Sequence, residues 1–340
     1  MNRLKISARK RSMSLKLDCN WRWSGRISRV LLGLCVFSGV LSLFAQTASW
    51  QPSPGHREMP IWPGKVPDGQ PVPGPETMKI DSDFFVAGRH VTGVFNVTQP
   101  TITVYAPTGE STGAAILVFP GGGFRGLAID LEGTEVCDWL TSAGITCVLL
   151  KYRVPSLPYD WHCKCRPDGL AISTLALEDA QRTMGLVRFH ASEWHIDPHK
   201  VGVLGFSAGG YLVAEISTHF DHRLYAPFDA ADRESCRPDF AVPIYPGHLW
   251  TEDNFELNPR IRVTRETPPT FLLQAENDPI DPVQNSLAYF AALKQAGVPV
   301  EMHLYAQGGH AFGMRSTEFP ITEWPKLVER WLRTIGITSK

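Results

Sequence analysis

Short, uninterrupted apolar segments alternate with helix-like segments from residue 101 onward, and this alternation limits the fold more than any other feature. The predicted strands are 101–107, 114–120, 145–152, 200–206, 239–246, 270–276 and 300–306. The predicted helices are 133–144, 175–194, 208–218, 282–297 and 323–336. Strands that are apolar along their whole length belong to a sheet buried on both faces, and helices between them favour parallel pairing. The sequence therefore predicts an α/β protein with a mostly parallel, doubly wound sheet in three α/β/α layers, formed by 76–340 as one domain.

The first 45 residues differ in charge from the rest of the chain. They contain nine basic side chains and one acid, Asp18. The uncharged segment 30–45 follows the basic stretch and is succeeded by small residues. This order is typical of a secretory signal, so we predict that 1–45 is a cleaved signal peptide. A retained membrane anchor is the alternative, although sixteen apolar residues fall short of the roughly 20 that span a bilayer.

The same division of charge limits the partners of the protein. Beyond residue 45 the chain holds 24 basic and 33 acidic side chains, which leaves no basic stripe to bind nucleic acid. A cleaved signal predicts an exported protein, periplasmic or extracellular, without membrane contact in its mature form. Residues 46–75 are rich in proline and glycine and should run extended over the surface rather than form helices.

Two long polar segments, 153–174 and 220–237, interrupt the alternation of strands and helices. Loops of this length often form lids or substrate walls, and ordinary surface excursions are the alternative. The first of them contains aromatic residues, Tyr159 and Trp161, which could stack on a flat ligand ring or simply pack, as could Trp250 further along the chain.

Five cysteines follow residue 45: Cys137, Cys147, Cys163, Cys165 and Cys236. Export permits disulfides, but an odd number leaves at least one thiol unpaired. Cys137 and Cys147 lie in apolar segments and are expected to be buried thiols, whereas Cys163 or Cys165 could pair with Cys236. Because no second ligand pair at zinc spacing accompanies the C-x-C sequence beside His162, we predict no metal site and no cofactor.

The sequence GFSAGG, residues 205–210, lies between a predicted strand and a predicted helix. Glycines at 205 and 209 allow a tight turn from which the Ser207 side chain projects beyond the sheet edge. Such a nucleophile elbow also aims the N–H of Ala208 at a reacting carbonyl. Ser207 is therefore the candidate nucleophile.

Serine needs a base, and the base needs an orienting group. His310 lies in the glycine-rich sequence YAQGGHAFG after the last predicted strand, and Asp278 directly follows the strand 270–276. The candidates follow one another along the chain as Ser207, Asp278 and His310. Each lies at the carboxyl end of a predicted strand, where an open α/β sheet binds its ligands. Asp281 is the competing orienting acid, and Asp278 is favoured because it is closer to the strand end.

The sequence VFPGGGFRG follows the predicted strand 114–120. Consecutive glycines can present bare N–H groups, and we expect those of Gly122 and Gly123 to complete an oxyanion hole with Ala208. A phosphate-binding loop would require a Lys-Ser/Thr or a GxGxxG spacing, and neither is present.

The motifs PGGGF, GFSAGG, DPxxP and GGHAFG, in this order, resemble those of α/β-hydrolase esterases related to hormone-sensitive lipase. The glycine loop of those enzymes reads HGGG, whereas this chain has Pro120 in place of the histidine. PIWPGKVPDG, LLKYRVP and NSLAYFAALKQAGVPVEMHLY resemble a bacterial group of acetyl xylan or feruloyl esterase-like proteins, over roughly residues 58–336. The resemblance implies the nucleophile Ser207, the base His310, the acid Asp278 and the oxyanion donors Gly122, Gly123 and Ala208.

The function predicted from these motifs is a serine carboxylic ester hydrolase that removes acetyl or feruloyl groups from xylan or related carbohydrate esters. A general short-chain carboxylesterase is one alternative. A second is an exported exopeptidase of the prolyl oligopeptidase type, although 75 residues before Glu76 cannot form the propeller such enzymes usually carry. A non-catalytic binding protein on this fold is the third, and is disfavoured because all three triad residues are present.

Overall fold

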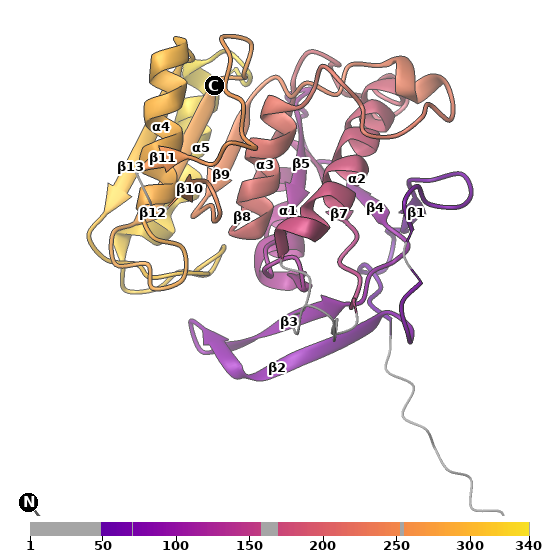
Figure 1. Cartoon of the computed structure of the whole chain (residues 1–340), viewed down its shortest axis with the longest axis horizontal. Coiled ribbons are helices and arrows are strands. Elements are labelled where there is room, and N and C mark those ends of the chain that lie inside the picture. The colour runs from indigo at the N-terminus through magenta and orange to yellow at the C-terminus, as the bar shows by residue number, and fades with distance from the viewer. Residues whose placement is uncertain (1–48, 70, 158–168, 252–254, 340) are drawn as a thin grey trace, which may run out of the picture. The chain divides into compact units, whose positions relative to one another are not determined.

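A large sheet crosses the structure, a computed structural model that describes residues 49–69, 71–157, 169–251 and 255–339. Its eight strands have the order β1-β4-β7-β5-β8-β9-β12-β13 (Figure 1). Their bounds are β1 Met59–Pro60, β4 Thr101–Tyr105, β5 Ala115–Phe119, β7 Thr146–Lys151, β8 Val201–Phe206, β9 Ala241–Ile244, β12 Thr270–Ala275 and β13 Val300–Tyr305. β1, β4 and β7 pair antiparallel in turn, whereas β7, β5, β8, β9, β12 and β13 pair parallel. The prediction of a mostly parallel sheet is confirmed.

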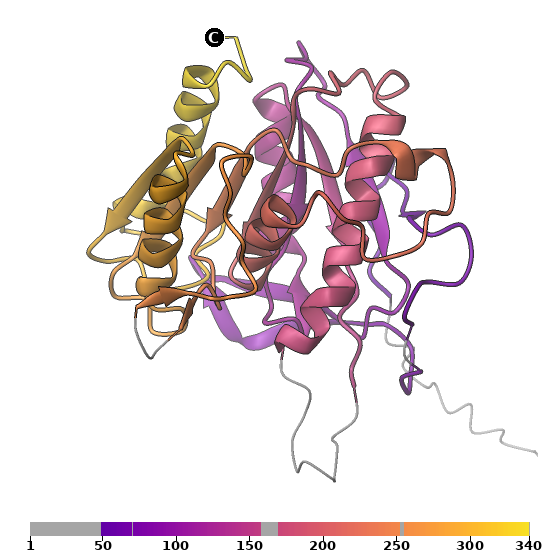
Figure 2. The same ribbon diagram turned by 45° about the horizontal axis from the view of Figure 1, so that its top comes forward.

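The described residues form five α-helices, of which the last follows the final strand: α1 Glu135–Ser142, α2 Gly169–Phe189, α3 Ala208–Thr218, α4 Gln284–Ala296 and α5 Trp324–Thr334. Figures 1 and 2 show α2, α3 and α4 on one face of the sheet, with α1 and α5 on the other. The rings of Trp139 in α1 and Trp324 in α5 pack edge to face, 5.1 Å apart. The central strands β5, β7, β8 and β9 are buried at every residue because helices cover both of their faces.

Short helices and small sheets complete the described structure. The short helices are η1 Asp130–Thr134, η2 Ala230–Arg233 and η3 Pro320–Glu323. A separate antiparallel sheet contains β2 Thr77–Val86, β3 Arg89–Phe95 and β6 Gly126–Ala128, and a third pairs β10 Trp250–Thr251 with β11 Glu256–Leu257. The sequence did not predict the hairpin β2–β3, since much of β2 is exposed and mixes polar with apolar residues without a burial period.

The proline-rich segment before β2 is extended, as predicted, but it is anchored in the interior rather than lying only on the surface. Ile61 and Trp62 are almost completely buried. The indole N–H of Trp62 donates to Asp179 at 2.9 Å, and the Ile61 carbonyl accepts from Arg182 at 2.9 Å. These bonds attach the segment to α2. Asp179 is fully buried at this contact.

The segment 220–237 also packs on α2. Arg182 donates to both carboxylate oxygens of Asp229 at 2.7 and 2.6 Å and forms an ion pair with Asp232 at 3.0 Å. The counterpart segment 153–174 is described only in part, since Tyr159, Trp161, His162, Cys163 and Cys165 lie outside the described residues.

The prediction that Cys137 and Cys147 are free thiols is wrong. Both are buried, but a disulfide joins them, with their Cα atoms 5.2 Å apart. Cys137 in α1 faces Cys147 in β7 because α1 packs directly on that strand. Cys236 is a buried free thiol in the described structure, and it donates to the Phe220 carbonyl. No helix within the described ranges is both long and apolar enough to cross a membrane, and the predicted signal 1–45 lies outside them.

Candidate active site

Ser207 occupies a strained turn between β8 and α3. Its φ and ψ are 52° and −117°, a backbone conformation with positive φ that residues other than glycine rarely adopt. The glycines around it are required for close packing. A Cβ at Gly209 would lie 2.0 Å from the Phe119 carbonyl oxygen, and one at Gly205 would lie 2.3 Å from that of Gly209. The strain therefore projects the Ser207 hydroxyl at the carboxyl edge of the sheet.

His310 and Asp278 are brought to Ser207 by neighbouring strands. Asp278 follows β12 and His310 follows β13, and the parallel pairing of these strands places their ends together. His310 Nε2 lies 3.0 Å from Ser207 Oγ, and Nδ1 lies 2.7 Å from Asp278 Oδ2. Asn277 fixes the two loops to each other, because its Oδ1 accepts the N–H groups of Gly308 and Gly309 at 3.1 and 2.9 Å. The structure thus assembles the three side chains that the sequence singled out.

The carboxylate of Asp278 is held by its own loop. Its Oδ1 accepts the backbone N–H groups of Ile280 and Asp281 at 2.9 and 3.0 Å, and Oδ2 remains directed at His310. The side chain is fully buried. A negative charge held in this way fixes the orientation of the imidazole ring and its Nδ1–H tautomer.

Asp281, the competing candidate, contacts a different part of the site. Ser207 Oγ donates to its Oδ2 at 3.1 Å, and the same oxygen lies 3.7 Å from His310 Nε2. Asp281 therefore lies on the Ser207 side of the imidazole, whereas Asp278 lies on the opposite side. The sequence did not predict a contact between Asp281 and the serine.

The glycine loop after β5 lies against the serine because β5 and β8 are adjacent and parallel. A Cβ at Gly121 would lie 3.0 Å from the Cβ of Ser207. Gly122 has φ 138° and no room for a side chain, since a Cβ there would lie 2.2 Å from the Gly126 carbonyl oxygen. Within the described residues, the N–H groups of Gly122 and Gly123 donate no hydrogen bond. The N–H of Ala208 lies in the first turn of α3, where no helical acceptor exists. The N–H groups of Gly122, Gly123 and Ala208 can therefore donate hydrogen bonds to an oxyanion.

Glu132 and Tyr245 connect the glycine loop to the histidine loop beneath the site, which the sequence did not reveal. Glu132 accepts the Gly121 N–H at 2.7 Å and the Tyr245 hydroxyl at 2.8 Å. The Tyr245 hydroxyl in turn accepts the Gly313 N–H at 3.1 Å, and its ring packs against His310 at 4.9 Å. This buried bridge holds both loops in position, since each polar atom in it has a partner.

Charges around His310 determine its protonation. Burial acts to lower the pKa of His310, but the hydrogen bond and charge of Asp278, together with the charges of Asp281 and Glu132, raise it above its ordinary value. Burial raises the pKa of Asp281, opposed by the positive charges that His310 and His248 can carry and by the hydrogen bond from Ser207, while the charge of Asp278 adds to the rise. Burial also raises the pKa of Glu132, and its bonds to Tyr245 and Gly121 oppose this.

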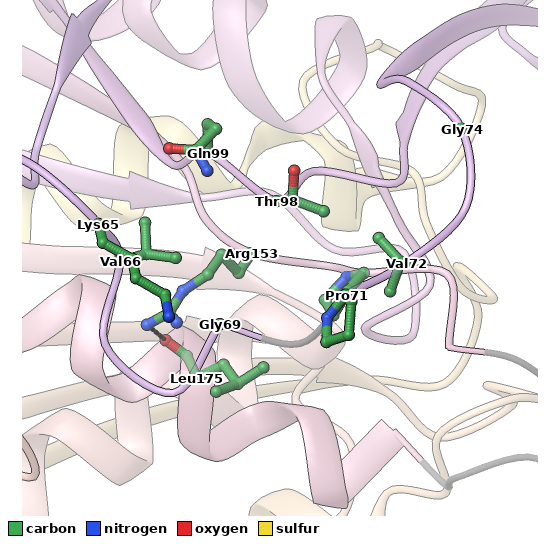
Figure 3. A pocket seen from close by; sticks show the side chains of 11 residues that line it. Lys65, Val66, Gly69, Pro71, Val72, Gly74, Thr98, Gln99, Arg153 and Leu175 are labelled. Carbon is green, nitrogen blue, oxygen red and sulfur yellow. Dashed lines mark hydrogen bonds between the residues drawn. The ribbon is translucent and has the colours of Figure 1, made fainter.

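A cavity of about 440 Å³ lies apart from these residues, between the segment 65–74 and Arg153 (Figure 3). The Arg153 guanidinium is already bound by Glu178, Asp179 and the carbonyls of Pro67 and Leu175, so this cavity reflects the anchoring of the N-terminal segment. A second cavity, of about 390 Å³, is lined by the hairpin β2–β3 and reaches Gly122. Of the three aromatic residues that could stack on a ligand or simply pack, Trp250 is half-buried in β10, and Tyr159 and Trp161 lie outside the described residues. The described ranges contain no group of three or more His, Cys, Asp or Glu side chains arranged to hold a metal ion.

Comparison with known proteins gives matches along most of the described chain. Residues 176–335 match the model of the prolyl oligopeptidase family. An acetyl ester-xyloside bifunctional hydrolase from Caldicellulosiruptor lactoaceticus is 32% identical, with a TM-score of 0.63 over 83% of this chain and 97% of that one. An acetylxylan esterase from Xylanibacter ruminicola is 29% identical over 66% of this chain and 45% of its own length. Endo-1,4-beta-xylanase B of Butyrivibrio fibrisolvens is 27% identical over 65% and 36%. The chain thus spans less than half the length of these two relatives.

Proposed function

The chain belongs to the α/β-hydrolase family, among proteins that resemble bacterial acetylxylan esterases, and from this we propose that it is a serine carboxylic ester hydrolase. The observation that carries the proposal is the continuous hydrogen-bonded series Ser207 Oγ, His310 Nε2, His310 Nδ1 and Asp278 Oδ2, with distances of 3.0 and 2.7 Å. This arrangement suits general-base activation of a serine hydroxyl. The series begins at a strained turn beside unpaired N–H groups.

In the proposed mechanism, His310 Nε2 takes the Ser207 proton while Oγ bonds to the ester carbonyl carbon. The carbonyl oxygen becomes an oxyanion, which accepts hydrogen bonds from the N–H groups of Gly122, Gly123 and Ala208. The bond to the alcohol oxygen then breaks, and the His310 imidazolium protonates that oxygen. Water next attacks the acyl-enzyme, giving its proton to His310, and the carboxylic acid leaves as Ser207 recovers its proton.

The proposed substrates are acetyl or feruloyl esters of xylan or related carbohydrates. Support comes from relatives named acetylxylan esterase and acetyl ester-xyloside bifunctional hydrolase. We also propose that residues 1–45 form a cleaved export signal and that 46–75 and 76–340 are the extended segment and the catalytic domain. An exported esterase could reach polymers outside the cell.

A fluorophosphonate probe tests the nucleophile directly. The folded protein is expected to incorporate one probe per chain, and peptide mapping by mass spectrometry should locate it on Ser207, because the adjacent His310 activates that hydroxyl alone. Protein unfolded in urea should not react, since unfolding separates the two side chains. Folded protein that stays unlabelled, or that carries the probe elsewhere, would contradict the proposal.

Rates on acetylated xylan, methyl ferulate, p-nitrophenyl acetate and a prolyl p-nitroanilide would then separate the possible substrates. We expect ester cleavage with little or no release of p-nitroaniline. Faster hydrolysis of the anilide than of the esters would favour the exopeptidase alternative. That alternative is included because residues 176–335 match the model of the prolyl oligopeptidase family. Cleavage of p-nitrophenyl acetate alone would favour a general short-chain carboxylesterase.

A further inference from the structure

Asp281 places a second carboxylate at the catalytic serine, in addition to the one that orients His310. Its Oδ2 is 3.1 Å from Ser207 Oγ and 3.7 Å from His310 Nε2, and its side chain is 13% exposed. A fixed negative charge beside a nucleophile that must generate an oxyanion opposes the reaction unless it lies away from the developing charge. The position of Asp281 therefore requires an explanation.

The loop that carries Asp281 holds it firmly in this position. Its backbone N–H donates to Asp278, and the side-chain amide of Gln274 donates to its carbonyl oxygen. Gly247 leaves room for the carboxylate, because a Cβ at that residue would lie 2.5 Å from Asp281 Oδ1. The contact with Ser207 is thus built from three segments of the chain, after β9, in β12 and after β12.

The chemistry of the proposed reaction assigns Asp281 to one side of the substrate. The carbonyl oxygen must point at the N–H groups of Gly122, Gly123 and Ala208, and the alcohol oxygen must lie within reach of His310 Nε2 to be protonated. Asp281 Oδ2 lies 3.7 Å from His310 Nε2, and Asp281 belongs to the loop after β12, not to the glycine loop. It therefore adjoins the site of the departing alcohol.

The hydrogen bonding of Asp281 changes as the reaction proceeds. Among the described residues, Ser207 is the donor to its carboxylate, although His310 Nε2 competes for the single hydroxyl proton at 3.0 Å. That proton passes to His310 when the serine attacks. The carboxylate then has the imidazolium Nε2 at 3.7 Å, beyond hydrogen-bond distance, and no hydrogen-bond donor among the residues that the structure describes. A largely buried carboxylate in this state is costly unless another donor replaces the serine.

We propose that Asp281 determines alcohol specificity by accepting a hydrogen bond from a hydroxyl on the carbon next to the ester-bearing carbon of a partially acylated sugar. This inference rests on the proposed esterase function. Such a hydroxyl lies beside the departing oxygen and supplies the donor that the carboxylate loses. A fully acylated sugar or a simple alkyl ester has no donor there. The site therefore favours sugars that keep a free hydroxyl next to the acyl group.

The matched substrates for the test are a monoacetylated methyl xyloside with a free neighbouring hydroxyl and its analogue that is deoxy at that carbon. The ratio of their kcat/KM values, from initial rates, is expected to be about 10-fold to 100-fold for the native protein, as for hydrogen bonds to charged groups. Asp281→Ala should reduce the ratio to near one, and Asp281→Asn to an intermediate value. Glu276→Gln, which removes an exposed carboxylate from the same loop, should keep the native ratio.

The outcomes separate this inference from the esterase function itself. Hydrolysis of p-nitrophenyl acetate with equal rates on the two xylosides would overturn the role of Asp281 and leave the esterase intact. No hydrolysis of any ester would overturn both. A native preference for acetylcholine over the hydroxylated xyloside, lost in Asp281→Ala, would show that the carboxylate binds cations instead and would also overturn the inference.

The pH profile provides a second readout of the same carboxylate. The charged groups that face His310 are Asp278, Asp281 and Glu132, while Asp281 itself faces His310, His248 and Asp278. Negative charge raises the pKa of His310, so the imidazole is protonated and inactive as a base up to a higher pH. Asp281→Asn removes one of these charges. The acidic limb of kcat/KM for p-nitrophenyl acetate should therefore shift to lower pH, and it should not shift in Glu276→Gln. An unchanged acidic limb, or a shift to higher pH, would contradict the placement of a charged Asp281 at Nε2.

Discussion

Ser207→Ala is expected to lower kcat/KM for p-nitrophenyl acetate by roughly 10⁴-fold to 10⁶-fold, since removal of a serine nucleophile has effects of this order in other triad hydrolases. The reason is specific to the oxygen. Oγ lies 3.0 Å from His310 Nε2 at a strained turn, and no other hydroxyl in the described structure bonds to that nitrogen. Loss of the oxygen leaves only the N–H groups and substrate positioning, which give a small residual rate. Steady-state kinetics measures the change, with circular dichroism to show that the variant is folded.

Ser217→Ala is a matched control for this substitution. Ser217 is buried on the same helix, and its hydroxyl has no hydrogen-bond partner among the described residues. Removal of that hydroxyl should leave both kcat/KM and Tm close to native values. Substantial activity in Ser207→Ala, with probe labelling retained, would contradict the assignment of the nucleophile.

Much of the site could be predicted because its signals are local. The apolar run of β8, the glycines around Ser207 and the helix pattern of α3 are contiguous, and together they specify an elbow. The sequence predicts Asp278 and His310 because each lies in the loop that follows a predicted strand. Parallel pairing of β12 and β13 then brings them together, which follows from the predicted sheet.

Features that depend on pairing between distant residues could not be predicted. The disulfide between Cys137 and Cys147 requires that α1 pack on β7 with both sulfur atoms facing each other, whereas the sequence shows only two cysteines in apolar segments. The bond from Tyr245 to Glu132 joins residues 113 positions apart, and neither belongs to a recognisable motif. The sequence presents Asp281 only as a competitor of Asp278 for the orienting role, since sequence distance from a strand end does not show which nitrogen of His310 a carboxylate faces.

Asp278→Asn is expected to lower kcat for p-nitrophenyl acetate by about 10⁴-fold, by analogy with the same substitution in another serine hydrolase. Asp278 Oδ2 accepts the Nδ1–H of His310 at 2.7 Å, which leaves Nε2 free to accept the Ser207 proton. An asparagine amide can instead donate to Nδ1, and this tautomer carries its proton on Nε2, where it cannot act as a base. The Ile280 and Asp281 N–H groups can still bond to the Asn oxygen, so the loop should remain folded.

Asp281→Asn is the informative comparison, because both substitutions remove one carboxylate charge near His310. Its effect on p-nitrophenyl acetate should be less than about tenfold, since Asp281 lies 3.7 Å from Nε2 and does not reach Nδ1. The rates of the two variants are compared at a pH above both acidic limbs, where His310 is neutral in each. The comparison then measures the effect on the His310 tautomer separately from the shift in the His310 pKa. A larger loss in Asp281→Asn than in Asp278→Asn would reverse the roles of the two acids, and with them the argument that the second carboxylate faces the alcohol.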